Sequence, residues 1–347
     1  MEMLTDISKW ISENESVLSG AAAIIVLLGV VISLLGFLYR WVSETPKSKA
    51  PNAQEAKGQR FEKITLKDLS APAPYPIQFA KSDGLNIAYA VFGSGAHDIL
   101  MAPGIISHLN IQSHMPSIRD TATAIGAFSR IICFDKRGQG LSDPSVSVPS
   151  LEERVHDIKA VMDAAGLDQV ILYGISEGGP MCMQFAHDYP ERVKGLILLG
   201  TTARWLQSEA YPMGIEERVL DAMPQAWGTG VLRNIFFPSV SREQMDDETY
   251  KGFERLIATR QSVRQLVDFF KLTDVRDLLP NIHCPTLVIH FTGDMAVPMR
   301  LGRAVADAIP NAEFFEVAGT DHADLSQSPE AVARVRQFAD GLVDPQY

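Results

Sequence analysis

Cysteine is scarce in this 347-residue sequence. The three cysteines, Cys133, Cys182 and Cys284, lie far apart, and no two of them form a Cys-x-x-Cys pair. An odd number of widely spaced cysteines provides no disulfide framework, so a reducing compartment fits the sequence best.

Positive charge is also in short supply. The chain has 31 lysines and arginines against 42 aspartates and glutamates, which gives a formal net charge of −11. A protein that binds nucleic acid needs a basic stripe to neutralise phosphates, so we expect no nucleic-acid partner. Hydrophobic residues make up 46% and charged residues 21%, as in ordinary globular proteins, and the length allows one large domain or two modest ones.

Charge is absent altogether from the run GAAAIIVLLGVVISLLGFLY, which extends from Gly20 to Tyr39. Roughly 20 residues at about 1.5 Å each span about 30 Å, the thickness of a bilayer core. The acidic segment before the run is unlike the basic start of a secretory signal peptide. We therefore expect a single transmembrane helix at residues 20–41, preceded by an N-terminal flank at residues 1–19.

The charges on either side of this run predict its orientation. Only one cationic residue precedes the run, and several follow it: Arg40, Lys47, Lys49, Lys57 and Arg60, against Lys9 before it. Because positive flanks stay on the cytoplasmic side, we expect a single-pass membrane protein whose C-terminal body is cytoplasmic. Residues 42–75 are rich in Pro, Ala, Lys, Glu and Ser, which predicts a flexible linker.

Beyond the linker, short apolar runs alternate with helical patterns, which predicts an α/β fold. The first two runs, IQFAKS and LNIAYAVF, are joined by Asp-Gly and indicate a hairpin. The later runs are rich in Ile, Leu and Val, as in a mostly parallel sheet with helices on both faces. We assign this core to residues 76–202 and 281–347. Residues 203–280 show only helical patterns and form an inserted segment that we expect to be a helical cap.

The stretch GISEGG places Ser176 between Gly174 and Gly178, directly after the apolar run QVILY. A Gly-x-Ser-x-Gly sequence between a strand and a helix is the pattern of a nucleophile elbow, in which the serine stands clear of the sheet edge. A serine hydroxyl needs a base to act as a nucleophile at neutral pH. The pattern therefore predicts that Ser176 is the nucleophile and that a base and an acid follow it in the chain.

Two later segments provide an acid and a base in the expected order. Asp294 ends the run PTLVIHFTGD, and His322 follows the last strand in VAGTDHADL. Both would meet Ser176 at the carboxyl edge of a parallel sheet. Asp321 is the rival acid, and we favour Asp294 because adjacent loop residues rarely point at each other. His290 lies within a predicted strand and is interpreted as a packed core residue.

An oxyanion hole needs two backbone N–H donors. We expect one from Glu177, which follows the nucleophile, and the other from Ile105 in the loop after the run DILMAPG. His108 follows in the same loop and is a candidate pocket residue. Phe236 and Phe269 are candidate pocket residues from the expected cap. No metal ligands are predicted.

These motifs resemble the α/β-hydrolase family over residues 76–345: APGI, FDKRGQGLSD, GISEGG, FTGD and GTDH occur in family order. The sequences around GISEGG and FDKRGQGLSD are most similar to hydrolase domains of bacteria, some of them joined to adenylate or guanylate cyclase domains. The resemblance implies a serine hydrolase that cleaves an ester-type bond through an acyl-serine, with a cap and without a cofactor. One departure from the family is Ala102-Pro103-Gly104, which stands where a His-Gly pair is common.

Three functions remain open at this point. The first is a membrane-anchored serine hydrolase acting on a small or lipid-derived ester, which the three triad candidates favour. The second is a ligand-binding sensor that keeps hydrolase residues with little turnover, motivated by the resemblance to cyclase-linked domains and by the membrane anchor. The third is another reaction of the same triad, such as acyl transfer or cleavage of a carbon–carbon bond. The sequence does not predict the oligomeric state.

Overall fold

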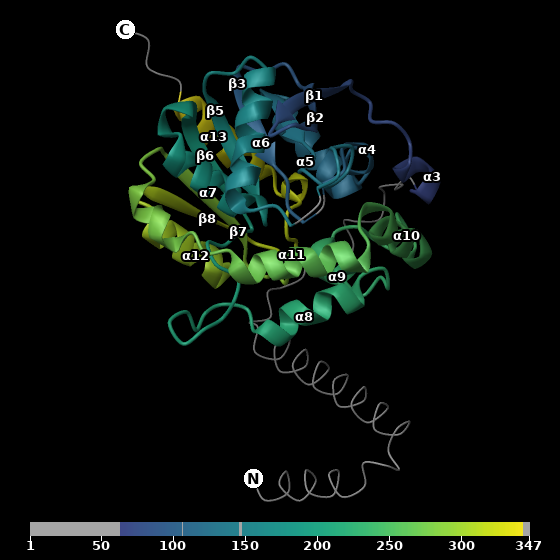
Figure 1. Cartoon of the computed structure of the whole chain (residues 1–347). Helices are drawn as coiled ribbons and strands as arrows, with labels where there is room; N and C mark the ends of the chain where they lie inside the picture. Colours follow the sequence, from purple (N-terminus) through teal and green to yellow (C-terminus); the bar gives the residue numbers. More distant parts are fainter. Residues whose placement is uncertain (1–62, 106, 146–147, 343–347) are drawn as a thin grey trace, which may run out of the picture. The chain divides into compact units, whose positions relative to one another are not determined.

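The computed structural model describes residues 63–105, 107–145 and 148–342 (Figure 1). The chain divides into two units between Arg60 and Phe61, and the described residues belong to the second unit. The predicted N-terminal flank, the transmembrane helix at 20–41 and the linker as far as residue 62 lie outside the described residues. None of the helices within the described ranges is long and apolar enough to cross a membrane.

The centre of the described part is a single mostly parallel sheet in the order β1-β2-β4-β3-β5-β6-β7-β8. The first hairpin pairs antiparallel, β2 pairs antiparallel with β4, and the remaining neighbours are parallel. The predicted α/β fold is thus confirmed. The strands are β1 (Ile77–Ser82), β2 (Leu85–Phe92), β3 (His97–Ala102), β4 (Ser129–Phe134), β5 (Val170–Ile175), β6 (Val193–Leu199), β7 (Thr286–Phe291) and β8 (Ala312–Val317).

The predicted hairpin of β1 and β2 turns at Asp83 and Gly84, whose φ angles are +48° and +86°. Two consecutive positive φ angles match the right-handed twist of a two-residue hairpin, and Asp-Gly tolerates them at low cost. The prediction of this hairpin is therefore confirmed at the level of its turn.

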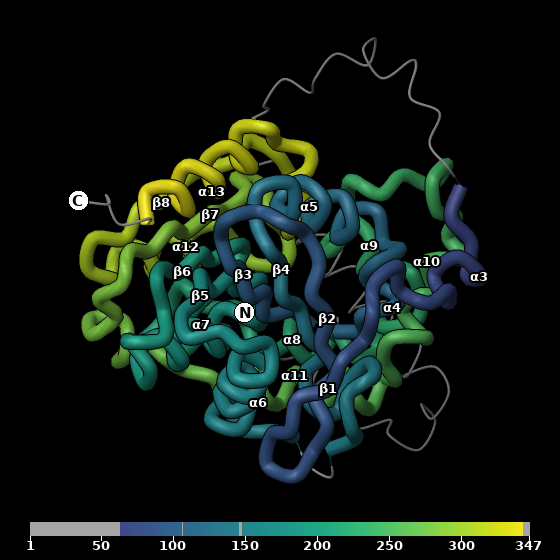
Figure 2. The backbone as a smooth tube through the Cα atoms, turned by 90° about the horizontal axis from the view of Figure 1, so that it is seen from above, coloured from purple at the N-terminus to yellow at the C-terminus, as the bar shows by residue number. Residues whose placement is uncertain are grey.

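Helices cover both faces of the sheet (Figures 1 and 2). One face packs on α5 (Pro116–Gly126) and α13 (Pro329–Gly341), and the other on α6 (Leu151–Ala164), α7 (Gly178–Asp188) and α12 (Met299–Ala308). Successive residues of β3 belong to opposite clusters, Ile99 to the first face and Leu100 to the second. Burial on both faces explains why the central strands are continuously apolar. Short elements complete the core: α4 (Leu109–Gln112), η1 (Pro190–Arg192) and η3 (Leu325–Gln327).

Helices are inserted between β6 and β7, within the range 203–280. They are α8 (Glu217–Ala226), α9 (Arg233–Phe236), α10 (Asp247–Ile257) and α11 (Arg260–Leu272), followed by η2 (Arg276–Asn281). One of their apolar clusters includes Trp227, Phe236 and Phe253, and also Ile111 and Met115 from the region of α4 and α5. The inserted helices therefore share a core with the segment that follows β3.

Residues 63–75 differ from the predicted flexible linker. They contain α3 (Leu66–Leu69), which Thr65 caps, and the Ile64 N–H donates to the Gln244 carbonyl at 2.8 Å. Leu69 is fully buried, and Ile64 and Leu69 both pack in the cluster of the inserted helices. The linker prediction is wrong for these residues because their apolar side chains find a hydrophobic surface that composition alone does not reveal.

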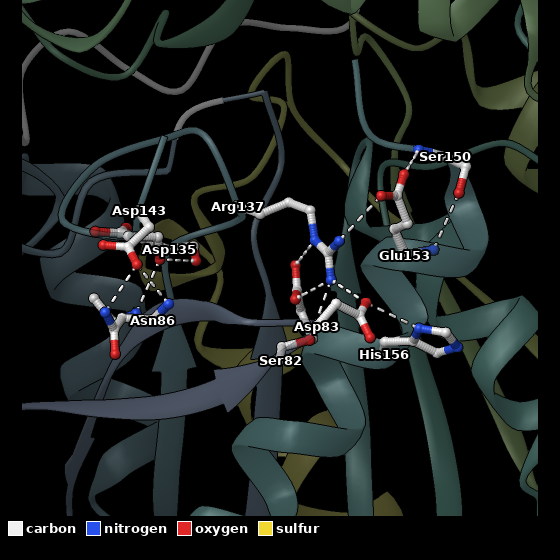
Figure 3. A network of polar contacts seen from close by, with 12 residues as sticks. Ser82, Asp83, Asn86, Asp135, Arg137, Asp143, Ser150, Glu153 and His156 are labelled. Carbon is white, nitrogen blue, oxygen red and sulfur yellow. Dashed lines mark hydrogen bonds and ion pairs between the residues drawn. The ribbon is translucent and has the colours of Figure 1, made fainter. Parts of the chain in front are cut away.

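A buried arginine fixes the loop after β4 (Figure 3). The Arg137 guanidinium donates to both carboxylate oxygens of Asp157 at 2.7 and 2.9 Å, and to Asp83 at 2.9 Å. It also contacts Glu153, which forms a capping box with Ser150 at the start of α6. A bidentate contact between two buried partners is geometrically specific. The loop after β4 is thereby held to α6 and to the β1–β2 turn.

Candidate active site

Ser176 lies in a tight turn between β5 and α7. Its φ angle is +52°, which is unusual for a residue with a side chain. The turn is held by its own backbone: the Ser176 N–H donates to the Leu199 carbonyl at 2.9 Å, and the Ser176 carbonyl accepts from the Thr201 hydroxyl at 2.5 Å. Such a strained turn between strand and helix is the geometry of a nucleophile elbow.

The glycines on either side of Ser176 are required by close packing. A Cβ atom on Gly178 would lie 2.3 Å from the Ala102 carbonyl oxygen, and one on Gly174 would lie 2.9 Å from the Gly179 Cα. Side chains at either position would therefore push the strand, the helix and the loop after β3 apart. The sequence-based reading of these two glycines agrees with the structure.

His322 and Asp294 are in direct contact. The His322 Nδ1 and the Asp294 Oδ2 are 2.8 Å apart, and both side chains are buried. The other Asp294 oxygen accepts the backbone N–H groups of Ala296 and Val297, which fixes the carboxylate. On the far side of the ring, the His322 Nε2 has no partner within the described residues. This nitrogen is available to a hydroxyl group.

Asp321, the alternative acid, has a different role in the structure. Its carboxylate accepts the N–H groups of Ala323 and Asp324 at 3.1 and 2.9 Å and that of Ser239 at 3.2 Å. It thus caps a turn and tethers the inserted segment. The geometry favours Asp294 as the partner of His322.

The pair of His322 and Asp294 shifts both pKa values. Burial disfavours the charged His322 ring, yet the Asp294 carboxylate outweighs it and raises the pKa of His322 above its usual 6.5. Burial likewise works against the Asp294 carboxylate, but His322 and His290 together lower its pKa. His290 is fully buried, as predicted, and its Nε2 lies 3.4 Å from Asp294. Sequence reasoning missed this second contact.

The two segments expected to provide oxyanion donors flank Ser176. Glu177 follows it directly, and a Cβ atom placed on Gly104 would lie 3.1 Å from the Ser176 Cβ and 3.7 Å from its Oγ. The loop that carries Ile105 therefore passes close to the hydroxyl. Backbone N–H groups at such a position can stabilise negative charge that develops on a substrate oxygen.

A buried charge cluster joins these two segments, and the sequence analysis did not anticipate it. The Lys136 Nζ donates to the Gly104 carbonyl and to the Glu177 Oε2, both at 2.6 Å. The second Glu177 oxygen accepts from the Arg154 guanidinium. The three side chains are at most 3% exposed, and burial lowers the pKa of Lys136 to about 8 against the pull of Glu177. Two features of the sequence could have indicated this cluster: the carboxylate of Glu177 directly after the nucleophile, and Lys136 in FDKRGQG.

A cavity of about 380 Å³ contains Ser176 and His322 in its wall. Ile105 and Phe236 also line it, as predicted for the oxyanion loop and the pocket. Phe237, the neighbour of Phe236, lines it as well. Both of these aromatic residues come from the end of α9, so the inserted helices contribute one wall of the site.

Two predicted pocket residues lie elsewhere. The Phe269 ring is covered by the Arg154 guanidinium, 4.0 Å from its centroid, and packs among the inserted helices. His108 is half-buried, and burial lowers its pKa, but it does not belong to the cavity wall. Both predictions rested on sequence position alone, which does not determine the direction of a side chain.

No group of three or more His, Cys, Asp or Glu side chains within the described ranges is arranged to hold a metal ion.

Comparison with protein families agrees with this geometry. The sequence pattern of the serine aminopeptidase S33 family (Hydrolase_4) matches residues 113–325, which is more than half of the chain. The chain belongs to this family of α/β-hydrolases. The hydrolase is accordingly an enzyme of the serine-hydrolase type.

Individual relatives differ in function. The hydrolase is 29% identical over 239 residues to 2-hydroxy-6-oxononadienedioate/2-hydroxy-6-oxononatrienedioate hydrolase of Cupriavidus pinatubonensis, covering 64% of this chain and 79% of that one. It is 24% identical over 263 residues to the karrikin insensitive 2 receptor CA of Petunia hybrida, covering 71% and 92%. Similar proteins thus include an enzyme and a receptor.

Solved structures show the same fold. An esterase from Exiguobacterium antarcticum superposes with a TM-score of 0.63 at 21% identity, covering 76% of this chain and 99% of that one. A hydrolase from Pseudomonas aeruginosa superposes with a TM-score of 0.61 at 25% identity, covering 76% and 97%. The hydrolase fold of residues beyond the N-terminal segment is therefore well supported.

The charge cluster yields a prediction about stability. Glu177→Gln leaves the buried Lys136 and Arg154 cations facing a neutral amide, so we expect the free energy of unfolding to fall by about 3–5 kcal/mol. Chemical denaturation followed by circular dichroism measures this change. Glu152→Gln on the exposed face of α6 is the matched control and should change stability by less than about 0.5 kcal/mol. Equal stability of the two variants would contradict the assigned role of Glu177.

Proposed function

We propose that the protein hydrolyses carboxylic esters through a triad of Ser176, His322 and Asp294. One observation carries the proposal: Ser176 and His322 line the same cavity, and Asp294 contacts the His322 Nδ1 while the Nε2 has no partner within the described residues. Nucleophile, base and orienting acid are then arranged in the order that acyl transfer to serine requires.

In the first half-reaction, the Ser176 oxygen attacks the ester carbonyl carbon, and the His322 Nε2 takes the hydroxyl proton. The carbonyl oxygen becomes an oxyanion between the N–H groups of Ile105 and Glu177. The carbon–oxygen bond to the alcohol then breaks, and His322 returns the proton to the departing alkoxide. In the second half-reaction, water repeats these steps on the acyl-serine and releases the carboxylic acid.

The cavity wall supports ester cleavage over aminopeptidase activity, which the family's name suggests. An aminopeptidase must bind the charged amino group of its substrate, for which a carboxylate is the natural partner. Among the described residues that line the cavity, none is an aspartate or a glutamate. An uncharged ester can bind without a carboxylate in the cavity wall.

The nucleophile is tested by Ser176→Ala. We expect this variant to lose turnover of p-nitrophenyl esters by at least about 10⁴-fold and to lose covalent labelling by a fluorophosphonate, because no oxygen remains to attack. Retained circular dichroism shows that the variant is folded. A wild-type protein that is folded but neither turns over esters nor labels would instead support the sensor hypothesis, and ligand binding without chemistry would be the next measurement.

The acid is tested through pH dependence. His322 accepts a proton only when neutral, and its pKa is raised by Asp294, so the acid limb of kcat/KM should have its midpoint above pH 6.5. Asp294→Asn should lower the pKa of the His322 ring, measured by NMR, and lower kcat by about 10³–10⁴-fold. The matched control is Asp321→Asn, for which both effects should be much smaller. A larger loss in Asp321→Asn would reverse the assignment of the acid.

We further propose that residues 20–41 anchor the protein in a membrane with the hydrolase body on the cytoplasmic side, as charge and hydropathy favour. The full chain should remain with membranes after a carbonate wash. Substituting both Leu28 and Leu35 by arginine should release it, because each charge at mid-bilayer disfavours insertion by about 2.5–3.5 kcal/mol. The same change at Ile7 and Ile11 is the control and should leave the protein bound. Digestion of the body by protease added to intact cells would contradict the orientation.

A further inference from the structure

The cavity does not stay between the core and the inserted helices; it extends beneath α5. Its walls beyond Ser176 come from strands on one side of β5 and from α5. The strands contribute Phe92, Met101 and Cys133, and α5 contributes Ile118, Thr121 and Ala122. Space that is normally filled between a sheet and a helix is here left open.

Strand register gives the depth of this space. Met101 is paired with Cys133, and Phe92 is paired with Ile131, three residues before the carboxyl end of β4. At roughly 3.3 Å per residue, the cavity reaches about 10 Å down the sheet from the edge where Ser176 lies. It is therefore deep enough for an extended chain.

We call the part of the cavity beneath α5 the tunnel. Its walls offer few polar groups to which a ligand could bind. Burial raises the pKa of the Cys133 thiol far above neutrality, so the thiol stays uncharged. The Thr121 hydroxyl donates to Asp324, the Ser113 hydroxyl to the Asn110 carbonyl, and the Tyr75 hydroxyl to the Leu109 carbonyl. Polar groups that are already paired present a surface that favours hydrocarbon.

The tunnel reaches solvent at the flank of α5. Ser176 and His322 are only 6% and 5% exposed, whereas Pro74, Arg119 and Thr123 are exposed lining residues. The Arg119 side chain is turned to Asp120, with a distance of 2.8 Å between the paired atoms. The end of the tunnel far from the nucleophile therefore opens between Pro74 and α5.

Sheet order determines which half of an ester would occupy the tunnel. His322 follows β8 and lies on one side of Ser176, whereas β3, β4 and β2 lie on the other side of β5. The alcohol must depart next to His322, which protonates it. Phe236 packs edge-on against the His322 ring on that side, with 6.2 Å between centroids. The tunnel therefore extends from the acyl side of the bond.

We propose that this space is an acyl-binding tunnel and that the preferred substrates are esters of medium- to long-chain unbranched acyl groups. The inference rests on the proposed ester hydrolysis and adds which half of the substrate is recognised. The acyl chain of such a substrate enters the tunnel past Ala122 and Cys133, and the distal end of the chain lies near Phe92.

Two substrate series test the proposal on the full-length protein in detergent. The first series varies acyl length from acetyl to palmitoyl with p-nitrophenol as the common leaving group. The second varies alcohol length in alkyl acetates. We expect kcat/KM to rise about two- to fourfold per added methylene in the acyl series until the tunnel is full, and to change little in the alcohol series. A rise with alcohol length alone would overturn the assignment of the tunnel to the acyl group.

A plugged tunnel provides the second arm. Ala122→Phe places a ring in the tunnel and should lower kcat/KM for the dodecanoyl ester by at least about tenfold, while the acetyl ester changes by less than about twofold. Ala122→Val should shorten the preferred chain by less than Ala122→Phe. Ala124→Phe is the matched control, because Ala124 lies on the same helix but not in the cavity wall. It should leave the chain-length profile unchanged.

The outcomes separate the two proposals. Retained turnover of the acetyl ester shows that a variant is folded and that the triad works. An unchanged profile in Ala122→Phe, with active triad chemistry, would overturn the tunnel alone. If the wild-type protein shows no ester turnover that depends on Ser176, the proposed hydrolysis itself is wrong. If Ala124→Phe mimics Ala122→Phe, general damage to α5 explains the result and the tunnel assignment is wrong.

Discussion

The buried carboxylate of Glu177 is the constraint on which the site depends. It stands directly after Ser176 and meets Lys136 from the loop after β4 and Arg154 from α6. Lys136 also holds the Gly104 carbonyl, so one cation joins the elbow to the loop that carries Ile105. Removing the Glu177 carboxylate would leave two buried cations, Lys136 and Arg154, without this partner in the interior, which is costly. The pairing of these charges therefore holds the elbow, the loop after β4 and α6 in fixed positions relative to one another.

The parallel sheet provides the frame into which those loops fit. Ser176, Asp294 and His322 each follow the carboxyl end of a strand, so the carboxyl edge of the sheet brings residues together that are distant in sequence. The strain at Ser176, with its φ of +52°, is compensated by hydrogen bonds to Leu199 and Thr201. A second buried arginine, Arg137, holds the loop after β4 in place through its contact with Asp157 on α6. Catalytic geometry thus depends on side chains that never meet a substrate.

The inserted helices and the core both contribute walls of the cavity. Phe236 and Phe237 reach the cavity from α9, close to His322, whereas α5 and the strands beneath it form the deeper walls. An acyl chain and an alcohol would therefore meet different parts of the fold. The segment 63–75 joins the inserted helices through Ile64 and Leu69, so part of the chain before the first strand also supports this wall.

The sequence by itself determined the fold class, the hairpin at Asp83, the elbow at Ser176 and the order of acid and base, because these depend on local patterns and on where strands end. Only the tertiary structure decided that Asp294 and not Asp321 contacts His322, since a carboxylate's direction depends on neighbours distant in sequence. It also removed Phe269 and His108 from the cavity wall and revealed the pairing of Lys136 with Glu177. The tunnel beneath α5 has no sequence signature, because a space left empty between a helix and a sheet follows from the packing of the whole core.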